Sequence, residues 1–241
     1  PGPIIILLAF LLAGIAGGGW GFIPGYLKAR FEVNEIVTTL MLNNVAILLT
    51  SYLVNYHFLP PGTANSVSYE IDPSAQLPTF ARSSQLNLTI VIALVAVVLV
   101  YLMFYRTTLG YEIRTVGDSK EFSRASGINV SRLIVMAMVI SGFIGGIAGA
   151  GQVLGVHYRF IAGFSPGYGF TGITVTLLAQ HNPFGVLVAA LLFGVLQNGG
   201  SYVQFFSSIP LDLVDIVQGI VIMLVTAQFS IDWLFRRRER S

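Results

Sequence analysis

The sequence predicts an all-α protein, a polytopic transmembrane helix bundle with about seven crossings and a short cytoplasmic helix. Two observations predict this class. Hydrophobic residues make up 54% of the 241 residues and charged residues only 10%, whereas a soluble domain carries about 25% charged residues. The apolar residues also gather in runs long enough to cross a bilayer. Too few charges remain to cover a water-facing surface, so a soluble fold is excluded.

A spanning helix needs about 20 apolar residues, because the hydrocarbon layer is about 30 Å thick and each residue rises about 1.5 Å. The segments that meet this length are 4–26, 36–58, 87–105, 132–156, 184–205 and 213–235. Segment 167–180 is apolar but reaches only about 21 Å. It fits either a thin crossing or a re-entrant piece that lines a cavity.

The positive charges decide between these alternatives. If all seven segments cross, eleven of the thirteen Lys and Arg residues share one side, and only Arg82 and Arg159 lie on the other. The eleven are Lys28, Arg30, Arg106, Arg114, Lys120, Arg124, Arg132, Arg236, Arg237, Arg238 and Arg240. The positive-inside rule makes their side cytoplasmic. We therefore count 167–180 as a crossing, which makes residues 106–131 a cytoplasmic loop, residues 59–86 an external loop and the C-terminus cytoplasmic.

We interpret residues 1–241 as a single transmembrane domain without a soluble domain. The chain opens with Pro1 and Gly2, without Met or a charged segment, so it does not resemble a signal peptide. We expect the start of the natural chain to be missing. The chain contains no Cys, which excludes disulfides and thiolate metal sites. It also contains no G-x-x-x-x-G-K-[ST] phosphate loop, so any ATP must be bound by another chain.

Glycines at four-residue spacing mark two of the predicted spans. The pairs are Gly14/Gly18, Gly17/Gly21, Gly142/Gly146, Gly145/Gly149 and Gly151/Gly155. Small residues four apart let two helix backbones approach each other closely. The spacing fits helix packing within one chain, and it also fits a face between two chains.

Polar side chains lie at membrane depth in four of the predicted spans. They are Thr39, Asn43, Asn44, Thr50, Ser51, Asn55, Gln152, Gln197, Asn198, Ser201, Gln204, Asp215 and Gln218. A polar group inside a membrane needs a partner or water. These residues therefore indicate either hydrogen bonds between helices or a wet, largely uncharged cavity. Such a cavity suits a neutral polar solute better than an ion, and the scarcity of membrane-centre Asp, Glu and His disfavours a proton relay.

Residues 163–167, Gly-Phe-Ser-Pro-Gly, match the G-x-S-x-G nucleophile pattern. A membrane enzyme would need a base such as His181 beside Ser165, but the predicted topology places the two at opposite ends of a crossing. We therefore interpret the pattern as a turn before a helix, with Ser165 as its cap and Pro166 in its first turn. The three histidines of the chain are too scattered for a metal site.

The cytoplasmic loop contains the signals of a short helix. Asp118 or Ser119 can cap a helix that runs to about Ser126, and Gly127 can end it. Such a helix between two spans is a rigid lever that can carry force from a soluble partner into the bundle, and the alternative is an ordinary connecting loop. The residues expected on this coupling surface are Gly117, Asp118, Ser119, Lys120, Glu121, Arg124 and Gly127.

The same loop carries a resemblance to a known family. The residues in register with that family's pattern are Thr108, Gly110, Arg114, Gly117, Gly127 and Ile128, while Thr115, Ser119, Phe122 and Ser123 depart from it. Segments 34–43, 167–170, 177–185 and 189–200 agree with the same family. Over essentially its whole length, the chain resembles the permease subunit of ABC importers, in the branch that serves branched-chain amino acids, ribose-type sugars and nucleosides.

Within that branch, residues 177–185 are similar to nucleoside permeases, whereas ribose permeases have a glycine-rich turn at the position of residues 180–183. The resemblance implies a nucleoside substrate, with a ribose-type simple sugar as the alternative. The residues expected along the substrate pathway are Asn43, Asn44, Gln152, Phe170, Gln197, Asn198 and Asp215. Phe170 is the expected stacking partner of the base.

The resemblance also implies the partners. A binding protein outside the membrane would deliver the solute, a second permease chain (identical or homologous) would share the pathway, and ABC ATPase subunits would grip the helix at about residues 118–127. No cofactor and no enzymatic activity are expected in this chain, because ATP would bind to the ATPase. The expected location is the plasma (inner) membrane of a prokaryote, in contact with lipid and without nucleic acid. An ion-coupled transporter that acts without an ATPase is the main alternative.

Overall fold

The computed structural model describes residues 2–63, 65–80, 85–165 and 167–206, together with the isolated residues 216, 219, 220 and 223. The chain divides into two compact units, Pro1–Phe164 and Ser165–Ser241, and each is described by itself. Helices dominate both units, and the only β-pairing among the described residues consists of two isolated bridges. The predicted all-α class is confirmed.

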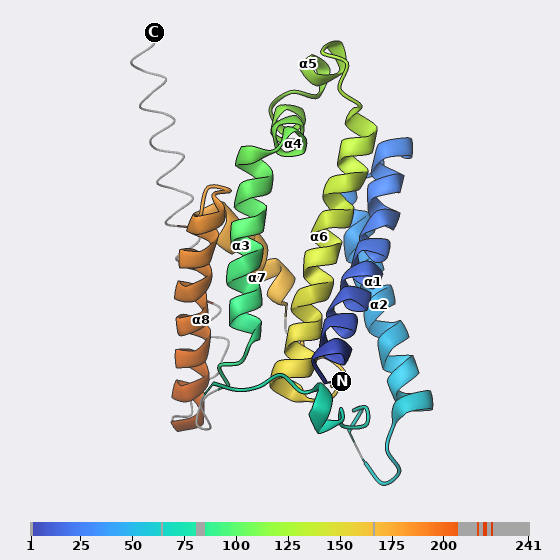
Figure 1. The fold of residues 1–241 in the computed structure, drawn as a ribbon, viewed down its shortest axis with the longest axis vertical. Coiled ribbons are helices and arrows are strands. Elements are labelled where there is room, and N and C mark those ends of the chain that lie inside the picture. The colour runs from blue at the N-terminus through green and yellow to red at the C-terminus, as the bar shows by residue number, and fades with distance from the viewer. Residues whose placement is uncertain are drawn as a thin grey trace. The chain divides into compact units, whose positions relative to one another are not determined.

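The first unit contains the blue to yellow helices of Figure 1. They are α1 (Gly2–Phe31), α2 (Glu35–Leu53), η1 (Val54–Phe58), η2 (Pro73–Ala75), α3 (Thr89–Arg106), α4 (Thr108–Asp118), α5 (Lys120–Ala125), α6 (Val130–Gln152) and η3 (Val153–His157). The short segments η1 and η3 are π-helical ends of α2 and α6, and η2 is a 3₁₀ turn. The second unit contains α7 (Tyr168–Leu178) and α8 (Pro183–Phe206).

Five helical segments are long and apolar enough to cross a membrane. They are Gly2–Phe31, Glu35–Phe58, Thr89–Arg106, Val130–His157 and Pro183–Gly200, and they coincide with five of the predicted spans. The predicted span 213–235 and the basic residues 236–240 lie outside the described residues, as does Arg82. The short helix α7 has 11 residues, which rise about 16 Å. The predicted number of crossings therefore stays a prediction.

Large apolar side chains lie mostly on the outside of these helices. Leu7 is 65% exposed, Leu48 71% and Val195 71%. A soluble protein would bury such residues, because apolar surface in contact with water costs about 25 cal/mol per Å². Hydrocarbon removes that cost, so this surface fits a bilayer. The chain is a multi-pass membrane protein.

Helices α1 and α6 pack backbone against backbone through their glycines. A Cβ atom on Gly142 would collide with the carbonyl oxygen of Gly17, and one on Gly21 would lie 2.5 Å from the carbonyl oxygen of Met138. The interpretation as packing within one chain is therefore confirmed for these glycines. Gly145 is different, because nothing described lies within 4 Å of an added Cβ there.

The predicted cytoplasmic loop folds into two helices instead of one. Ser119 caps α5, since its hydroxyl oxygen accepts a hydrogen bond from the Phe122 amide at 3.2 Å, and Gly127 follows the helix with φ +79°. The predicted short helix is thus present, although its role in coupling is untested. Asp118 is the last residue of α4 and not a cap. The sequence interpretation missed α4, whose amphipathic turn buries Val116 against α6.

The predicted cap of α7 is wrong. Helix α7 begins at Tyr168, its N-cap is Gly167 with φ +80°, and no side chain caps it. Ser165 instead accepts a hydrogen bond from the Gly167 amide through its carbonyl oxygen, at 2.8 Å. The left-handed backbone at Gly167 separates Ser165 from the helix, and such a conformation favours glycine over a capping serine. Pro166 lies outside the described residues.

The predicted external loop folds back onto the end of α6. Its residues 66–71 run beside residues 158–162, and the Leu77 amide donates to the carbonyl oxygen of Leu154 at 3.0 Å. Within the loop, Asp72 accepts a hydrogen bond from the Ser74 amide at 2.8 Å. That bond holds the pKa of Asp72 below its ordinary value of 3.8. Residues 66–77 of this loop are therefore an integral part of the first unit.

Candidate solute cavity

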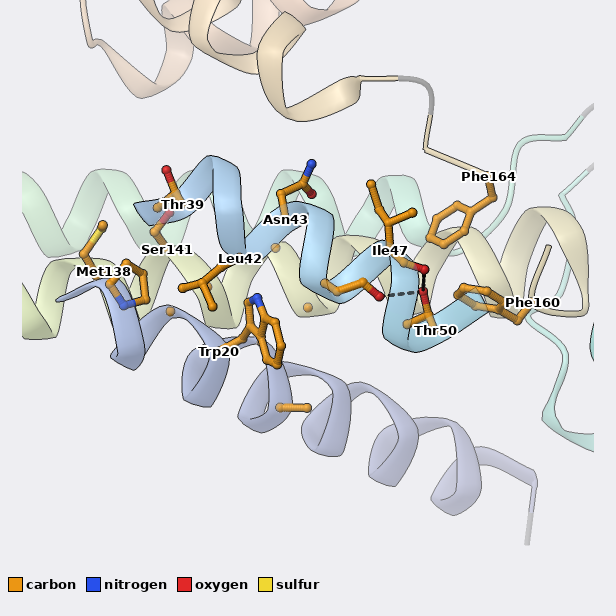
Figure 2. Close-up of a pocket in the computed structure, with 18 residues that line it drawn as sticks. Trp20, Thr39, Leu42, Asn43, Ile47, Thr50, Met138, Ser141, Phe160 and Phe164 are labelled. Carbon is orange, nitrogen blue, oxygen red and sulfur yellow. Dashed lines mark hydrogen bonds between the residues drawn. The ribbon is translucent and has the colours of Figure 1, made fainter. Parts of the chain in front are cut away.

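The first unit contains an open cavity of about 710 Å³ between α1, α2, α6 and the segment that follows η3. Figure 2 shows that it extends along α2, with Thr39 and Met138 at one end and Thr50 and Phe160 at the other. Its volume lies within the range of about 300–1,000 Å³ typical of small-molecule sites. The cavity is therefore the candidate functional site.

The polar lining of the cavity comes mainly from α2. Thr50 donates its hydroxyl hydrogen to the carbonyl oxygen of Ala46, 2.8 Å away, and Thr39 donates to that of Glu35 at the same distance. Their oxygens can therefore act toward a solute as acceptors only. Within the described part of the chain, no partner is recorded for the Asn43 amide, which can both donate and accept. Asn43 is thus the most versatile polar group on α2.

Three aromatic side chains and one serine complete the lining. Trp20 comes from α1 and Ser141 from α6, while Phe160 and Phe164 follow η3. The rings of Phe160 and Phe164 meet edge to face, with centroids 5.4 Å apart. Aromatic rings offer flat apolar surfaces against which a planar or ring-shaped solute can stack. The cavity thus combines flat apolar walls with a few hydrogen-bonding groups.

No ionisable side chain belongs to the described lining of the cavity. A charged solute would have to leave water without a countercharge, which is unfavourable. A zwitterionic amino acid would need partners of both signs. A neutral solute with hydroxyl or amide groups needs only the hydrogen bonds that Asn43, Ser141 and Trp20 can offer. The chemistry of the lining therefore favours a neutral polar solute.

The structure places the predicted pathway residues in different environments. Asn43 lines the cavity, whereas its neighbour Asn44 donates to the Leu40 carbonyl oxygen on its own helix at 3.0 Å. Gln152 is half-buried at the end of α6 and does not line the cavity. The remaining predicted residues, Phe170, Gln197 and Asn198, belong to the second unit, and Asp215 lies outside the described residues.

Among the aromatic and polar residues that line the cavity, the sequence analysis missed Trp20, Ser141, Phe160 and Phe164. A weak signal existed for two of them. Trp20 is a large aromatic residue within a glycine-rich span, and Ser141 is a polar residue inside α6. Phe160 and Phe164 carry no such signal, because only the path of the chain after η3 brings them to the cavity.

The predicted coupling residues gather around α5. Those from Gly117 to Glu121 line a second hollow of about 550 Å³ between α4, α5 and α6. Arg124 lies 4.0 Å from Glu32 in the turn between α1 and α2. Phe122 stands 61% exposed on α5. An exposed aromatic side chain on a short, charged helix is a common anchor for a protein partner.

No group of three or more potential metal ligands occurs among the residues that the structure describes. Ser165 and His181 lie at opposite ends of α7, whose 11 residues span about 16 Å. They are therefore too far apart for a nucleophile and a base. The fold and the cavity together define a multi-pass membrane protein with an uncharged, solute-sized site.

Comparison with known proteins identifies the family of this membrane protein. Residues 1–226 match the family described as branched-chain amino acid transport system / permease component, and the chain belongs to that family. The resemblance noted in the sequence is thereby confirmed. The chain is a transport subunit, like the other permease components of this family.

Three relatives are similar over nearly the whole chain. A guanosine ABC transporter permease protein of Bacillus subtilis is 35% identical over 100% of this chain and 70% of its own length. A glucose ABC transporter permease protein of Haloferax volcanii is 34% identical over 95% of this chain and 63% of its own length. A nucleoside ABC transporter permease protein of Lactococcus lactis is 31% identical over 96% of this chain and 66% of its own length. The chain thus spans about two thirds of the length of these relatives. The search of solved structures returned no significant match.

Proposed function

We propose that this chain is the permease subunit of an ATP-driven ABC importer and that it translocates a nucleoside or a related neutral polar solute. The observation that carries this proposal is the 710 Å³ cavity, whose described lining is uncharged and combines Trp20 and two phenylalanines with the Asn43 amide. A nucleoside joins a flat base to a hydroxylated sugar, and both parts find matching groups there. A branched-chain amino acid, charged at both ends, does not.

The partners follow from the family and from the open side of the cavity. Asn43 and Ser141 are exposed, so the first unit alone does not enclose a solute. A second permease chain would close the cavity, and a solute-binding protein would load it from outside. ABC ATPase subunits, which bind the ATP, would contact α5. The chain would lie in the plasma (inner) membrane of a prokaryote, with α5 and the C-terminus in the cytoplasm.

A ribose-type or other simple sugar is the second candidate substrate. The glucose permease relative from Haloferax volcanii supports it, since its identity to this chain nearly equals that of the guanosine permease. A sugar would use Asn43 and Ser141 but would need Trp20 less than a nucleoside base. The effect of Trp20→Ala on uptake therefore separates the two substrates.

The test measures uptake of guanosine and of glucose by the full-length transporter complex in proteoliposomes. We expect Asn43→Ala to raise KM about ten-fold, because a lost hydrogen bond that leaves a polar group unpaired costs about 1–3 kcal/mol. Asn44→Ala is the matched control, since Asn44 bonds its own helix, and it should change KM less than two-fold.

Two outcomes would contradict this proposal. Equal effects of the Asn43 and Asn44 substitutions would show that the cavity is not the solute site. Uptake of neither guanosine nor glucose by a complex that hydrolyses ATP would show that the substrate class is wrong.

A further inference from the structure

One end of the solute cavity is occupied by Phe160 and Phe164. Figure 2 shows both rings beside Thr50 and Ile47, at the end of α2 that leads into the predicted external loop. Phe164 also contacts the ring of His157, with centroids 6.0 Å apart. Both phenylalanines are half-buried. In the proposed orientation, they stand between the cavity and the outside.

No helix determines where these two rings lie. Helix η3 ends at His157, and Tyr158 takes a left-handed backbone with φ +55°, which turns the chain away from the helix axis. Beyond this turn the residues up to Phe164 have an irregular backbone. Their position must therefore come from contacts with another part of the chain.

Those contacts are hydrogen bonds to the predicted external loop and an ion pair between Arg159 and Glu70, 3.7 Å apart. The Ser68 amide donates to the carbonyl oxygen of Phe160, and the Phe160 amide donates back to the hydroxyl oxygen of Ser68, both at 2.9 Å. On the two sides of this pair of bonds, the Ala162 amide donates to the carbonyl oxygen of Ser66 at 3.0 Å, and the Ile71 amide donates to that of Tyr158 at 2.8 Å. Ser68 is the only described residue whose side chain accepts a hydrogen bond from this segment.

We propose that Phe160 and Phe164 form the outer gate of the solute cavity, and that Ser68 is the residue that positions them. The gate opens when residues 66–71 separate from residues 158–162. A pairing of so few residues at the surface can open locally while the helices stay folded. A protein that docks on residues 66–71 from outside would thereby control access to the cavity. The assignment of a gate rests on the proposed function, because that function implies that a solute occupies the cavity and that residues 66–71 face the outside of the membrane.

The first test measures access to the cavity and needs no knowledge of the substrate. None of the 241 residues is Cys, so Thr50→Cys in the full transporter complex gives this chain a single thiol at the gated end. A membrane-impermeant maleimide is added from outside. We expect Ser68→Ala to increase the labelling rate roughly five-fold, because Phe160 loses one hydrogen bond. Ser68→Thr, which keeps the hydroxyl, should restore the original rate.

Ser66→Ala is the matched control. Ser66 lies in the same segment, but only its backbone carbonyl bonds residue 162, so its substitution should leave labelling unchanged. Equal labelling with Ser68→Ala and Ser66→Ala would overturn the assignment of Ser68. Failure of Ser68→Thr to restore the original rate would also overturn it, because the Ser68 hydroxyl would then not be the group that holds Phe160.

The second test locks the gate with a disulfide. The hydrogen bonds on both sides of Val67 and Ile161 make these residues a non-hydrogen-bonded antiparallel pair, whose Cα atoms lie about 4.5 Å apart. This distance is within the range of a disulfide. We expect the oxidised double variant Val67→Cys with Ile161→Cys to lose uptake at least about ten-fold, and a reductant to restore it.

The outcomes of these tests distinguish a failure of the gate proposal from a failure of the proposed function. Failure of the disulfide to form, or unchanged uptake once it has formed, would overturn the gate. If the reduced variant and the parent chain take up neither guanosine nor glucose, the proposed substrate class fails instead. Labelling at position 50 then still decides whether Ser68 controls access.

Discussion

Residues of the same type that lie close in sequence have different roles in this protein. Asn43 faces the cavity and Asn44 bonds its own helix, because successive side chains leave a helix about 100° apart. Gly142 and Gly145 differ in the same way. The first touches the backbone of α1, and nothing described lies close to the second. These pairs provide matched controls that differ in contact but not in chemistry.

We predict that Gly142→Ala destabilises the protein and that Gly145→Ala does not. A methyl group on Gly142 meets the carbonyl oxygen of Gly17, and overpacking of this kind costs about 1–3 kcal/mol. At Gly145 the added methyl group meets nothing described, and alanine favours a helix over glycine by about 1 kcal/mol. The measurement is the Tm of the purified protein in detergent. Equal Tm values would mean that α1 and α6 do not pack through their glycines.

At the scale of elements, α5 is joined to the turn between α1 and α2 by charged residues. Arg124 lies 4.0 Å from Glu32, and Lys28 pairs with Glu35 at 2.5 Å across the same turn. Exposed ion pairs contribute only about 0–1 kcal/mol, so they do little for stability. Helices α1 and α2 line the cavity. The Arg124–Glu32 pair thus places α5 next to the turn between two helices that line the cavity.

We predict that Gly127→Pro combined with Arg124→Glu lowers the solute-stimulated ATPase activity of the transporter complex by at least about ten-fold. Proline fixes φ near −65°, whereas Gly127 has φ +79° at the end of α5. The control is Gly62→Pro, because Gly62 has φ +87° but lies in the predicted external loop. It should leave ATPase activity within about two-fold, since an external turn makes no contact with an ATPase. Equal loss in both variants would refute a coupling role for α5.

At the scale of the whole molecule, the distribution of charge predicts how the bundle is oriented in the membrane. Helix α5 and the last turn of α1 carry basic residues at one end of the first unit, and the loop that pairs with residues 158–162 lies at the other end (Figure 1). This separation agrees with the predicted orientation.

We predict the sidedness of four single-cysteine variants. Tyr69→Cys and Ser165→Cys should react with an impermeant maleimide on intact cells, whereas Phe122→Cys and Asn182→Cys should react only after permeabilisation. The reason is the excess of basic residues on the α5 side together with a crossing by α7. The chain as it stands contains no Cys and is the unlabelled control. Reaction of Asn182→Cys on intact cells would show that α7 does not cross.

The sequence predicted the helices better than the cavity. Five spans, the cap at Ser119 and the end at Gly127 were correct, because each depends on a local pattern of hydrophobicity, capping or backbone freedom. Helix α4 was missed, since its apolar stripe is short and lies within a charged loop. The cap at Ser165 was wrong because the conformation of Gly167 cannot be read from the G-x-S-x-G pattern.

By itself, the sequence determined that this protein lies in a membrane, which segments form its long helices and which family it belongs to. Those properties depend on segment length, composition and motifs, all of which are local. Only the tertiary structure decided that Asn43 and not Asn44 lines a cavity, that the glycines of α1 meet those of α6, and that Ser68 holds Phe160. Each of these depends on segments far apart in the sequence, such as Ser68 and Phe160 at 92 residues. Such contacts arise from packing, which no local pattern encodes.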